Sequence, residues 1–240
     1  MKVAIGFYGI TRSLKFTIES IRTKIFDVLK ENNISYDVFI HTYRLTQFKN
    51  ERTRECVKCN EIDNEEYKLL HANYEQIDDQ DKIKEQLHLS KYRSCRDPWK
   101  TKYNSVDNFI LGQFSKYNLT KMIEATKNTY DYILFMRPDC LYLDSFSIDF
   151  FNFVNDTSIV IPNFHLFGPY NFNDRFCIAN MNTYKIYGEV FTQLLDISKK
   201  EPLHSETVIG KIFENNHITV SRVKFNFSRV RYFGRIQDSF

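Results

Sequence analysis

An apolar segment, an amphipathic segment and a second apolar segment succeed one another within residues 1–41, and this order constrains the fold more than any other feature. Residues 2–8 are apolar at alternate positions with small residues between them, as in a buried strand. After a break at 9–13, apolar side chains recur at helical spacing, at Leu14, Ile18, Ile21, Ile25 and Val28. Residues 36–41 predict a second strand, parallel to the first. The carboxyl ends of both strands then meet at the edge where open α/β sheets bind ligands.

Strands and helices continue to alternate along the rest of the chain. The pattern predicts further strands near residues 74–77, 132–136, 158–161, 176–179 and 218–227. It predicts further helices over 79–89, 106–126, 183–195 and 205–214. Residues 44–103 are rich in charged side chains and weakly periodic, and we interpret them as a variable insertion or an exposed helical flank. The predicted fold class is α/β, with a mostly parallel central sheet flanked by helices in a single domain over residues 1–240.

Size and composition exclude several other classes of protein. A chain of 240 residues can bury roughly 70% of its extended surface and needs no disulfide or metal to fold. No apolar run approaches the roughly 18 residues that cross a membrane, and residues 1–6 become polar too soon for a signal peptide. The five cysteines are scattered, as in a reducing compartment, and the close pair Cys56 and Cys59 lacks a second pair to complete a zinc site. We expect a soluble cytoplasmic protein.

The charge of the chain is nearly balanced overall but unevenly distributed. A net charge of +3 is too small for obligatory nucleic-acid binding, so we expect no nucleic-acid partner. Between residues 211 and 235, however, the single acid Glu214 stands among six basic side chains, which are Lys211, Arg222, Lys224, Arg229, Arg231 and Arg235. Arg229 and Arg231 alternate as on a strand, and they either face a phosphate or belong to a solvated basic surface.

The most informative segment is Arg137-Pro138-Asp139, which directly follows the apolar strand at 132–136. Proline ends the strand, so Arg137 and Asp139 lie at the same sheet edge as the ends of the first two strands. A carboxylate there can hold Mg²⁺ or Mn²⁺ together with a diphosphate, and an arginine can hold phosphate directly through its planar fork. The alternative is a surface turn in which Arg137 pairs with Asp139 or Asp144.

Several segments, taken in order, resemble the GT-A glycosyltransferases. They are residues 3–13, 36–42 and 135–139, residues 170–179 with the run Asn173-Asp174-Arg175-Phe176, and His204-Ser205-Glu206 at the start of a helix. The resemblance is greatest to small stand-alone enzymes of large DNA viruses and of microbial surface-polysaccharide clusters, and a viral protein would act in the host cytoplasm. Because these segments are spread over nearly the whole chain, the resemblance implies one Rossmann-like domain that binds a nucleotide sugar.

The resemblance implies a role for each matching residue. The donor is a nucleoside-diphosphate sugar, with a UDP-sugar favoured over a GDP-sugar, and the acceptor is a glycan or another hydroxyl compound. The residues implied for donor binding are Phe7, Tyr8, Gly9, Thr11, Arg12, His41, Thr42, Arg137, Asp139 and Arg175, with His41 and Thr42 near the base or ribose. Arg137 stands where the family has the first acid of its Asp-x-Asp motif, which leaves Asp139 as the lone candidate ligand for a divalent cation, Mn²⁺ or Mg²⁺. Arg137 and Arg12 would contact the diphosphate.

Glycosyl transfer makes its own demands on a site, whatever the family. Negative charge grows on the leaving diphosphate and must meet a cation or an arginine. An inverting enzyme also needs a carboxylate base that takes the proton of the acceptor hydroxyl. Asp174 and Glu206 are the catalytic candidates, and Asp174 also suits the donor sugar. Each has a plainer alternative, since Asp174 can pair with Arg175 and Glu206 can favour a helix N-terminus. His41 can likewise be satisfied by backbone groups at a strand end.

Two other classes of function fit the same fold. One is a nucleotidyl- or phosphotransferase on a similar sheet. The other is a non-catalytic module that binds glycan or nucleic acid through the basic C-terminal segment. The chain contains neither a Walker pattern nor Gly-x-Gly-x-x-Gly, which argues against kinases and dinucleotide enzymes.

Overall fold

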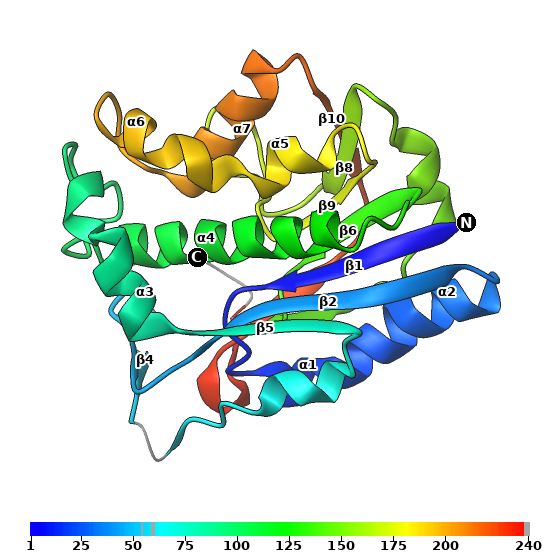
Figure 1. Ribbon diagram of the computed structural model, residues 1–240, viewed down its shortest axis with the longest axis horizontal. Coiled ribbons are helices and arrows are strands. Elements are labelled where there is room, and N and C mark those ends of the chain that lie inside the picture. Colours follow the sequence, from blue (N-terminus) through cyan, green and yellow to red (C-terminus); the bar gives the residue numbers. More distant parts are fainter. Residues whose placement is uncertain (54, 59–60, 238–240) are drawn as a thin grey trace.

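A seven-stranded sheet crosses the middle of the molecule and carries helices on both faces (Figure 1). The structure is a computed structural model that describes residues 1–53, 55–58 and 61–237, so Cys59 of the Cys56 and Cys59 pair lies outside the described residues. In spatial order the strands of this sheet are β10 (Thr219–Val223), β8 (Ser158–Pro162), β9 (Phe176–Ala179), β6 (Tyr132–Met136), β1 (Lys2–Tyr8), β2 (Ser35–Arg44) and β5 (Tyr74–Asp79). All neighbouring pairs are parallel except those that β9 makes with β6 and β8. The predicted α/β class with a mostly parallel, helix-flanked sheet is confirmed.

Two smaller sheets lie outside the central one. The hairpin of β3 (Phe48–Asn50) and β4 (Glu55–Val57) is the first. The second contains β7 (Cys140–Tyr142), β11 (Phe227–Val230) and β12 (Ile236–Gln237), with β11 in the middle. These strands are short, and β3, β4 and β7 have only three residues each, too few for a periodic sequence signal.

The helices differ widely in length. The α-helices are α1 (Leu14–Ile21), α2 (Asp27–Glu31), α3 (Gln80–Leu87), α4 (Asn104–Ala125), α5 (Tyr184–Gly188), α6 (Leu194–Ser198) and α7 (Ser205–Asn215). A π-helical turn, η1 (Arg22–Phe26), joins α1 to α2. Short 3₁₀ helices are η3 (Glu66–Leu70), η4 (Leu89–Tyr92), η5 (Ile148–Phe153), η6 (Val190–Gln193) and η7 (Tyr232–Gly234).

The alternation of side chains in β1 divides the hydrophobic core between the two faces of the sheet. Val3, Ile5 and Phe7 are buried with the side chains of α1 and α2. Ala4 and Tyr8 are buried with those of α4, α5 and α7, on the opposite face in Figure 1. Gly6 lies directly under α4, where a Cβ atom would come within 2.6 Å of a Leu119 methyl carbon, so the missing side chain lets α4 approach the sheet.

The strand pairing gathers distant chain segments at one edge of the sheet. Tyr8 at the end of β1 lies opposite His41 of β2, and Phe7 lies opposite Met136 at the end of β6. Because β9 is antiparallel to β6 and its first residue, Phe176, also pairs with Met136, the residues before β9 reach this same edge. The segments after β1 and β6 and the segment before β9 therefore meet.

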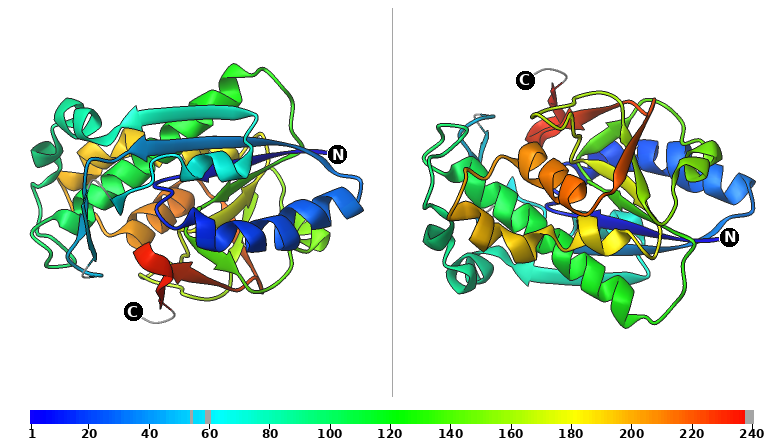
Figure 2. Two further views of the ribbon diagram at one scale, coloured as in Figure 1. Left: turned by 90° about the horizontal axis from the view of Figure 1, so that it is seen from below. Right: turned by 90° about the horizontal axis from the view of Figure 1, so that it is seen from above.

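The C-terminal strands join this edge from the side. The Val230 N–H donates a 2.9 Å hydrogen bond to the Asp139 carbonyl, and the Ser13 hydroxyl donates one of 2.9 Å to the Val230 carbonyl. Figure 2 shows this red C-terminal segment beside the blue start of α1. The basic C-terminal segment thus lies against the turn that follows β6.

The structure corrects three details of the predicted elements. The single helix expected over 183–195 is wrong, because the backbone leaves α-helical geometry at Glu189 (φ −101°, ψ 17°) and the segment divides into α5, η6 and α6. Gly188, the last residue of α5, packs closely against Thr120 of α4. The strand expected over 218–227 divides into β10 and β11, which belong to different sheets. Residues 44–103 supply the edge strand β5 of the central sheet as well as the β3–β4 hairpin. Among the described residues, no helix is both long and apolar enough to span a bilayer.

Candidate functional site

A cavity opens at the carboxyl edge of the sheet, beside the ends of β1 and β6. Its volume of about 180 Å³ is far above the roughly 15 Å³ that one water molecule requires, so it admits groups of an organic ligand. Residues 8–10 after β1, the β3–β4 hairpin, the amino-terminal half of α4 and the first turn of α7 form its walls. The residues that follow β6 and precede β9 complete the wall, so the cavity lies where the strand order predicts a ligand site.

Arginines dominate the charge of the cavity wall. Among the residues that the structure describes, six arginines line it, namely Arg12, Arg52, Arg137, Arg175, Arg229 and Arg231, against the two carboxylates of Asp174 and Glu206. Burial, together with the positive charges of Arg175, Arg231 and Arg137, lowers the pKa of Arg229. Because an arginine keeps its proton in proteins, this crowding raises the free energy of the cationic wall, and a bound anion would lower it. The cavity is therefore built for a negatively charged ligand.

Arg137 and Asp139 form a bidentate ion pair behind this wall. Arg137 Nε and Nη2 donate hydrogen bonds of 2.8 and 2.6 Å to the two carboxylate oxygens of Asp139. Arg12 Nη2 lies 3.9 Å from the same carboxylate. Burial opposes the charge of Asp139, but the Arg137 guanidinium outweighs it and holds the pKa of this carboxyl well below its usual range. Asp139 is only 1% exposed and does not line the cavity, whereas the half-buried Arg137 does.

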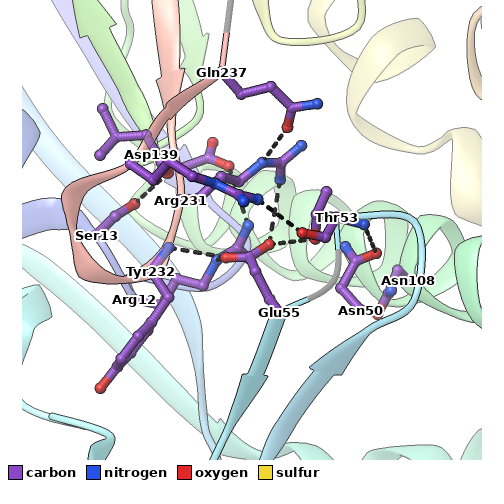
Figure 3. A network of polar contacts seen from close by, with 12 residues as sticks. Arg12, Ser13, Asn50, Thr53, Glu55, Asn108, Asp139, Arg231, Tyr232 and Gln237 are labelled. Carbon is purple, nitrogen blue, oxygen red and sulfur yellow. Dashed lines mark hydrogen bonds and ion pairs between the residues drawn. The ribbon is translucent and has the colours of Figure 1, made fainter.

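Glu55 of the β3–β4 hairpin is a second buried carboxylate that forms ion pairs with arginines of the wall, Arg12 and Arg231 (Figure 3). Its carboxylate lies 3.4 Å from Arg12 Nε and 3.9 Å from Arg231 Nη1. It also accepts hydrogen bonds from the Thr53 hydroxyl at 2.5 Å and from the Tyr232 N–H at 2.8 Å. Residues from three distant parts of the chain are thereby fixed around one buried carboxylate.

Asp174 and Glu206 lie on either side of the Arg175 guanidinium. Arg175 is 3.7 Å from an Asp174 oxygen and 3.6 Å from a Glu206 oxygen. Burial works against the charge of Asp174, yet Arg175, Arg137 and Arg229 together lower its pKa. Burial and the nearby charge of Asp174 raise the pKa of Glu206, which also accepts a hydrogen bond from the Ser205 hydroxyl. The pKa values of these two neighbouring carboxyls are therefore shifted in opposite directions.

Two tyrosines hold the backbone of Asp174 in place. The hydroxyls of Tyr8 and Tyr187 donate hydrogen bonds of 2.8 and 3.0 Å to the Asp174 carbonyl oxygen. Behind them the ammonium of Lys116 in α4 lies 3.3 Å from the centre of the Tyr187 ring and 5.6 Å from that of Tyr8. Burial lowers the pKa of Lys116 to about 7. The end of β1 and the inner face of α4 thus position Asp174 from behind.

The outer part of the cavity is aromatic as well as polar. Tyr43, Phe48, Trp99 and Phe109 contribute to its lining. Trp99 stacks on His204 with ring centres 5.3 Å apart, and its loop is ordered by Asp97, which accepts a hydrogen bond of 3.0 Å from the Trp99 N–H. Flat apolar surfaces of this kind suit a nucleobase or the apolar face of a sugar.

Most of the residues selected from the sequence meet at this cavity. Tyr8, Gly9, Arg12, Arg137, Asp174, Arg175 and Glu206 line it. Gly9 adopts φ +97°, which favours glycine, and its N–H donates a 2.8 Å hydrogen bond to Ser115 of α4. Phe7, Thr11 and Thr42 are buried elsewhere and do not contribute to the lining.

His41 lies in a polar network between the sheet and α4 and outside the cavity lining. Its Nδ1 is 2.8 Å from the Ser115 hydroxyl, and its Nε2 is 3.1 Å from both Asp78 Oδ2 and Asn118 Nδ2. The histidine is completely buried and satisfied by side chains. Ser115 links the histidine ring to Gly9 of the cavity wall, and the ring also contacts that of Tyr43.

The residues around Asp139 do not fit a divalent cation. Both carboxylate oxygens of Asp139 accept hydrogen bonds from Arg137, and Arg12 adds a second positive charge nearby. Mg²⁺ and Mn²⁺ require oxygen ligands and are repelled by guanidinium groups. Within residues 1–53, 55–58 and 61–237, no three His, Cys, Asp or Glu side chains are grouped as a metal site requires.

Several residues of the site were not predicted from the sequence. Arg52 and Glu55 lie in the charged region 44–103, where nothing distinguishes them from solvated neighbours. Lys116 lies in a helix and looks like any surface lysine until the structure shows its burial. For Arg229 and Arg231 the sequence left two alternatives, and the structure places both at the cavity wall, 7% and 4% exposed.

Comparisons with known proteins give likenesses among solved structures only. No protein-family model and no curated protein matches the sequence. The apo form of the glycosyltransferase GlyE of Streptococcus pneumoniae TIGR4 is similar with a TM-score of 0.40 and 12% identity, over 91% of this chain and 44% of that one. The galactosyltransferase LgtC, solved with donor and acceptor sugar analogues, is similar with a TM-score of 0.44 and 12% identity. That likeness covers 92% of this chain and 73% of LgtC, so the chain spans less than half of the length of GlyE and about three quarters of LgtC.

Proposed function

We propose that this protein is a glycosyltransferase that moves a sugar from a nucleoside-diphosphate sugar to the hydroxyl of a glycan or another acceptor. The observation that carries the proposal is the pair of Asp174 and Glu206, which share Arg175 at the wall of an arginine-lined cavity. The resemblance of residues 3–13, 135–139 and 170–179 to GT-A glycosyltransferases supports the same conclusion and favours a UDP-sugar as the donor.

The two carboxyl groups have different roles in this proposal. Asp174 stays ionised beside Arg175, Arg137 and Arg229, and it orients the donor sugar and stabilises the positive charge of the oxocarbenium-like transition state. Glu206, whose pKa is raised, accepts the proton of the acceptor hydroxyl as the general base. A base works best when its pKa lies near the pH of the reaction, which favours Glu206 over Asp174 for this step.

The remaining groups of the cavity match the other parts of a nucleotide sugar. The arginines meet the charge that develops on the leaving diphosphate. The half-buried Trp99 offers a stacking surface for the base. The wall therefore has parts that complement a diphosphate and a base.

Product analysis with a panel of nucleotide sugars tests this function. The protein is incubated with UDP- and GDP-sugars, with and without mixed oligosaccharide acceptors, and the nucleotides are separated by chromatography. We expect release of a nucleoside diphosphate that increases when the right acceptor is present. Release of pyrophosphate from nucleoside triphosphates instead would indicate a nucleotidyltransferase, and no turnover of any donor would contradict the proposal.

A matched pair of variants links the activity to the site. Asp174→Asn removes the charge of the carboxylate next to Arg175, and we expect it to abolish release of the diphosphate. Asp196→Asn changes an exposed carboxylate of α6, whose side chain is 79% accessible, and should leave release unchanged. Equal activity of both variants would exclude the assigned role of Asp174.

A further inference from the structure

We propose that guanidinium groups alone hold the diphosphate of the donor, and that no divalent cation takes part in its binding. This inference rests on the proposed use of a nucleotide sugar, and it extends that proposal to the chemistry of the phosphate site. Three observations carry it: the state of Asp139, the charge of the wall and the origin of its arginines.

The carboxylate best placed to bind a metal is already occupied. Arg137 binds both oxygens of Asp139 at 2.8 and 2.6 Å, and the whole side chain is 1% exposed. A cation at this carboxylate would have to displace one guanidinium and then lie close to a second, that of Arg12 at 3.9 Å. Asp139 therefore serves as the anchor of Arg137 and leaves the outer side of that arginine at the cavity.

The charge of the wall is sufficient without a metal. In the described part of the chain, six arginines and two carboxylates line the cavity. Asp139 and Glu55, which lie behind the wall, pair with arginines of this set and add two further negative charges. The surplus of these ten side chains is two positive charges. A diphosphate that joins two ester groups carries about two negative charges, one for each phosphate. Bound there, it would match the surplus charge of these ten described side chains.

The arginines are held so that their forks converge from separate elements. Arg12 precedes α1, Arg137 follows β6, Arg175 precedes β9, and Arg229 and Arg231 come from the end of β11. Buried carboxylates fix three of them, since Asp139 binds Arg137 and Glu55 lies between Arg12 and Arg231. A planar guanidinium that is fixed in this way pairs with two phosphate oxygens at little entropic cost, which a flexible lysine does not achieve.

Inorganic pyrophosphate is the simplest probe of this site. Its binding to the full chain is measured by calorimetry and by thermal shift, in EDTA and again in Mg²⁺ or Mn²⁺, with sulfate at equal ionic strength as the control anion. We expect saturating pyrophosphate to raise the melting temperature by a few degrees in EDTA. Addition of Mg²⁺ or Mn²⁺, which themselves bind pyrophosphate, should not increase its affinity for the protein. Sulfate should give a much smaller shift.

Variants of Arg229 connect the binding to the wall. We expect Arg229→Gln to weaken pyrophosphate at least about 10-fold and Arg229→Lys, which keeps the charge but not the fork, to weaken it less. Arg44→Gln, a change at the exposed end of β2, should leave the affinity unchanged. If Arg229→Gln does not fold, Arg229→Lys still tests the inference, because an unchanged affinity of this variant for pyrophosphate would contradict a contact with the Arg229 guanidinium.

The outcomes separate this inference from the proposed function. Binding of pyrophosphate or UDP that requires Mg²⁺ or Mn²⁺ would overturn the inference and leave glycosyl transfer intact, as would equal shifts with sulfate. Tight binding in EDTA without turnover of any nucleotide sugar would support the anion site and contradict the proposed function. Glycosyl transfer that proceeds at full rate in EDTA would support both.

Discussion

The ammonium of Lys116 lies 3.3 Å from the centre of the Tyr187 ring, and Tyr187 in turn donates a hydrogen bond to the carbonyl oxygen of Asp174. No hydrogen-bond partner of the Lys116 Nζ is found in the part of the chain that the structure describes. A buried lysine without a hydrogen-bond partner is costly to stability while it is protonated. Its lowered pKa makes that cost measurable.

Replacement of this lysine should stabilise the protein at neutral pH. The pKa of Lys116 is lowered to about 7, whereas an unfolded lysine titrates near 10.4, so between these values only the unfolded chain binds the proton. Stability of the wild type therefore rises with pH across this window, and Lys116→Met should lack that rise. We expect the variant to be about 1–4 kcal/mol more stable at pH 7, with the difference shrinking by about 1 kcal/mol per pH unit towards pH 10. Denaturant unfolding at several pH values measures this.

The exposed Lys82 on α3 provides the control for that experiment. Its side chain is 76% accessible, so Lys82→Met should change neither the stability nor its dependence on pH. Parallel pH curves for wild type and Lys116→Met would show that Lys116 keeps its ordinary proton affinity in the folded state.

The pH dependence of turnover should identify Glu206 as the base. Burial and Asp174 raise the pKa of Glu206, so activity should increase with pH through a midpoint above the ordinary value of about 4.3. Glu206→Gln should lower kcat by about 10²–10⁴-fold and remove this limb from the pH profile. The variant should keep its melting temperature, because glutamine removes a buried charge that Asp174 disfavours. A variant that retains the acid limb would assign the base to another group.

Asp139 should prove important for stability as well as for the site. Its pKa lies below the usual value, so it contributes stability that is fully present above pH 4 and is lost as the pH falls towards the folded-state pKa. Asp139→Asn leaves Arg137 without its buried partner and should cost about 3–5 kcal/mol at pH 7. The loss should shrink below pH 4, where Asp139 becomes protonated in the unfolded wild type while it is still ionised in the folded protein. Asp196→Asn is the matched exposed control, and an equal effect of both changes on denaturant unfolding would exclude the buried pair as the cause.

Replacement of His41 should lower the stability of the protein and leave its affinity for ligand nearly unchanged. His41→Ala removes a fully buried ring together with the hydrogen bonds that it makes with Asp78, Ser115 and Asn118, which we expect to cost about 2–4 kcal/mol of unfolding free energy. Because His41 does not line the cavity, the affinity for UDP should change less than about 3-fold. A stable variant that has lost its nucleotide affinity would place His41 at the base or ribose after all.

Much of the architecture could be predicted from the sequence, because the hydrophobic periodicity of a strand or helix is a local property of the chain. The alternation of Val3, Ile5 and Phe7 and the apolar run 132–136 identify the two central strands, and their parallel order places the ligand edge. The single helix expected over 183–195 is divided in the structure, and Gly188, where α5 ends, packs against Thr120 of α4, far away in the chain. Local patterns contain no information about such packing.

The same limit applies to the residues of the site. Arg137, Asp174 and Glu206 lie next to strong strands or helices and could be selected, whereas Glu55 matters only because Arg12 and Arg231 converge on it from distant segments. Asp139 was selected as a metal ligand because carboxylates suit metals, and only the structure shows that Arg137 covers both of its oxygens.

Steady-state kinetics of Asp174→Asn with the preferred nucleotide sugar test the central claim most directly. The account predicts that kcat/KM for diphosphate release falls at least about 100-fold, while the dissociation constant for the free nucleoside diphosphate changes only a few-fold. A variant that releases the diphosphate at the wild-type rate would contradict the assignment of this cavity as a glycosyltransferase site.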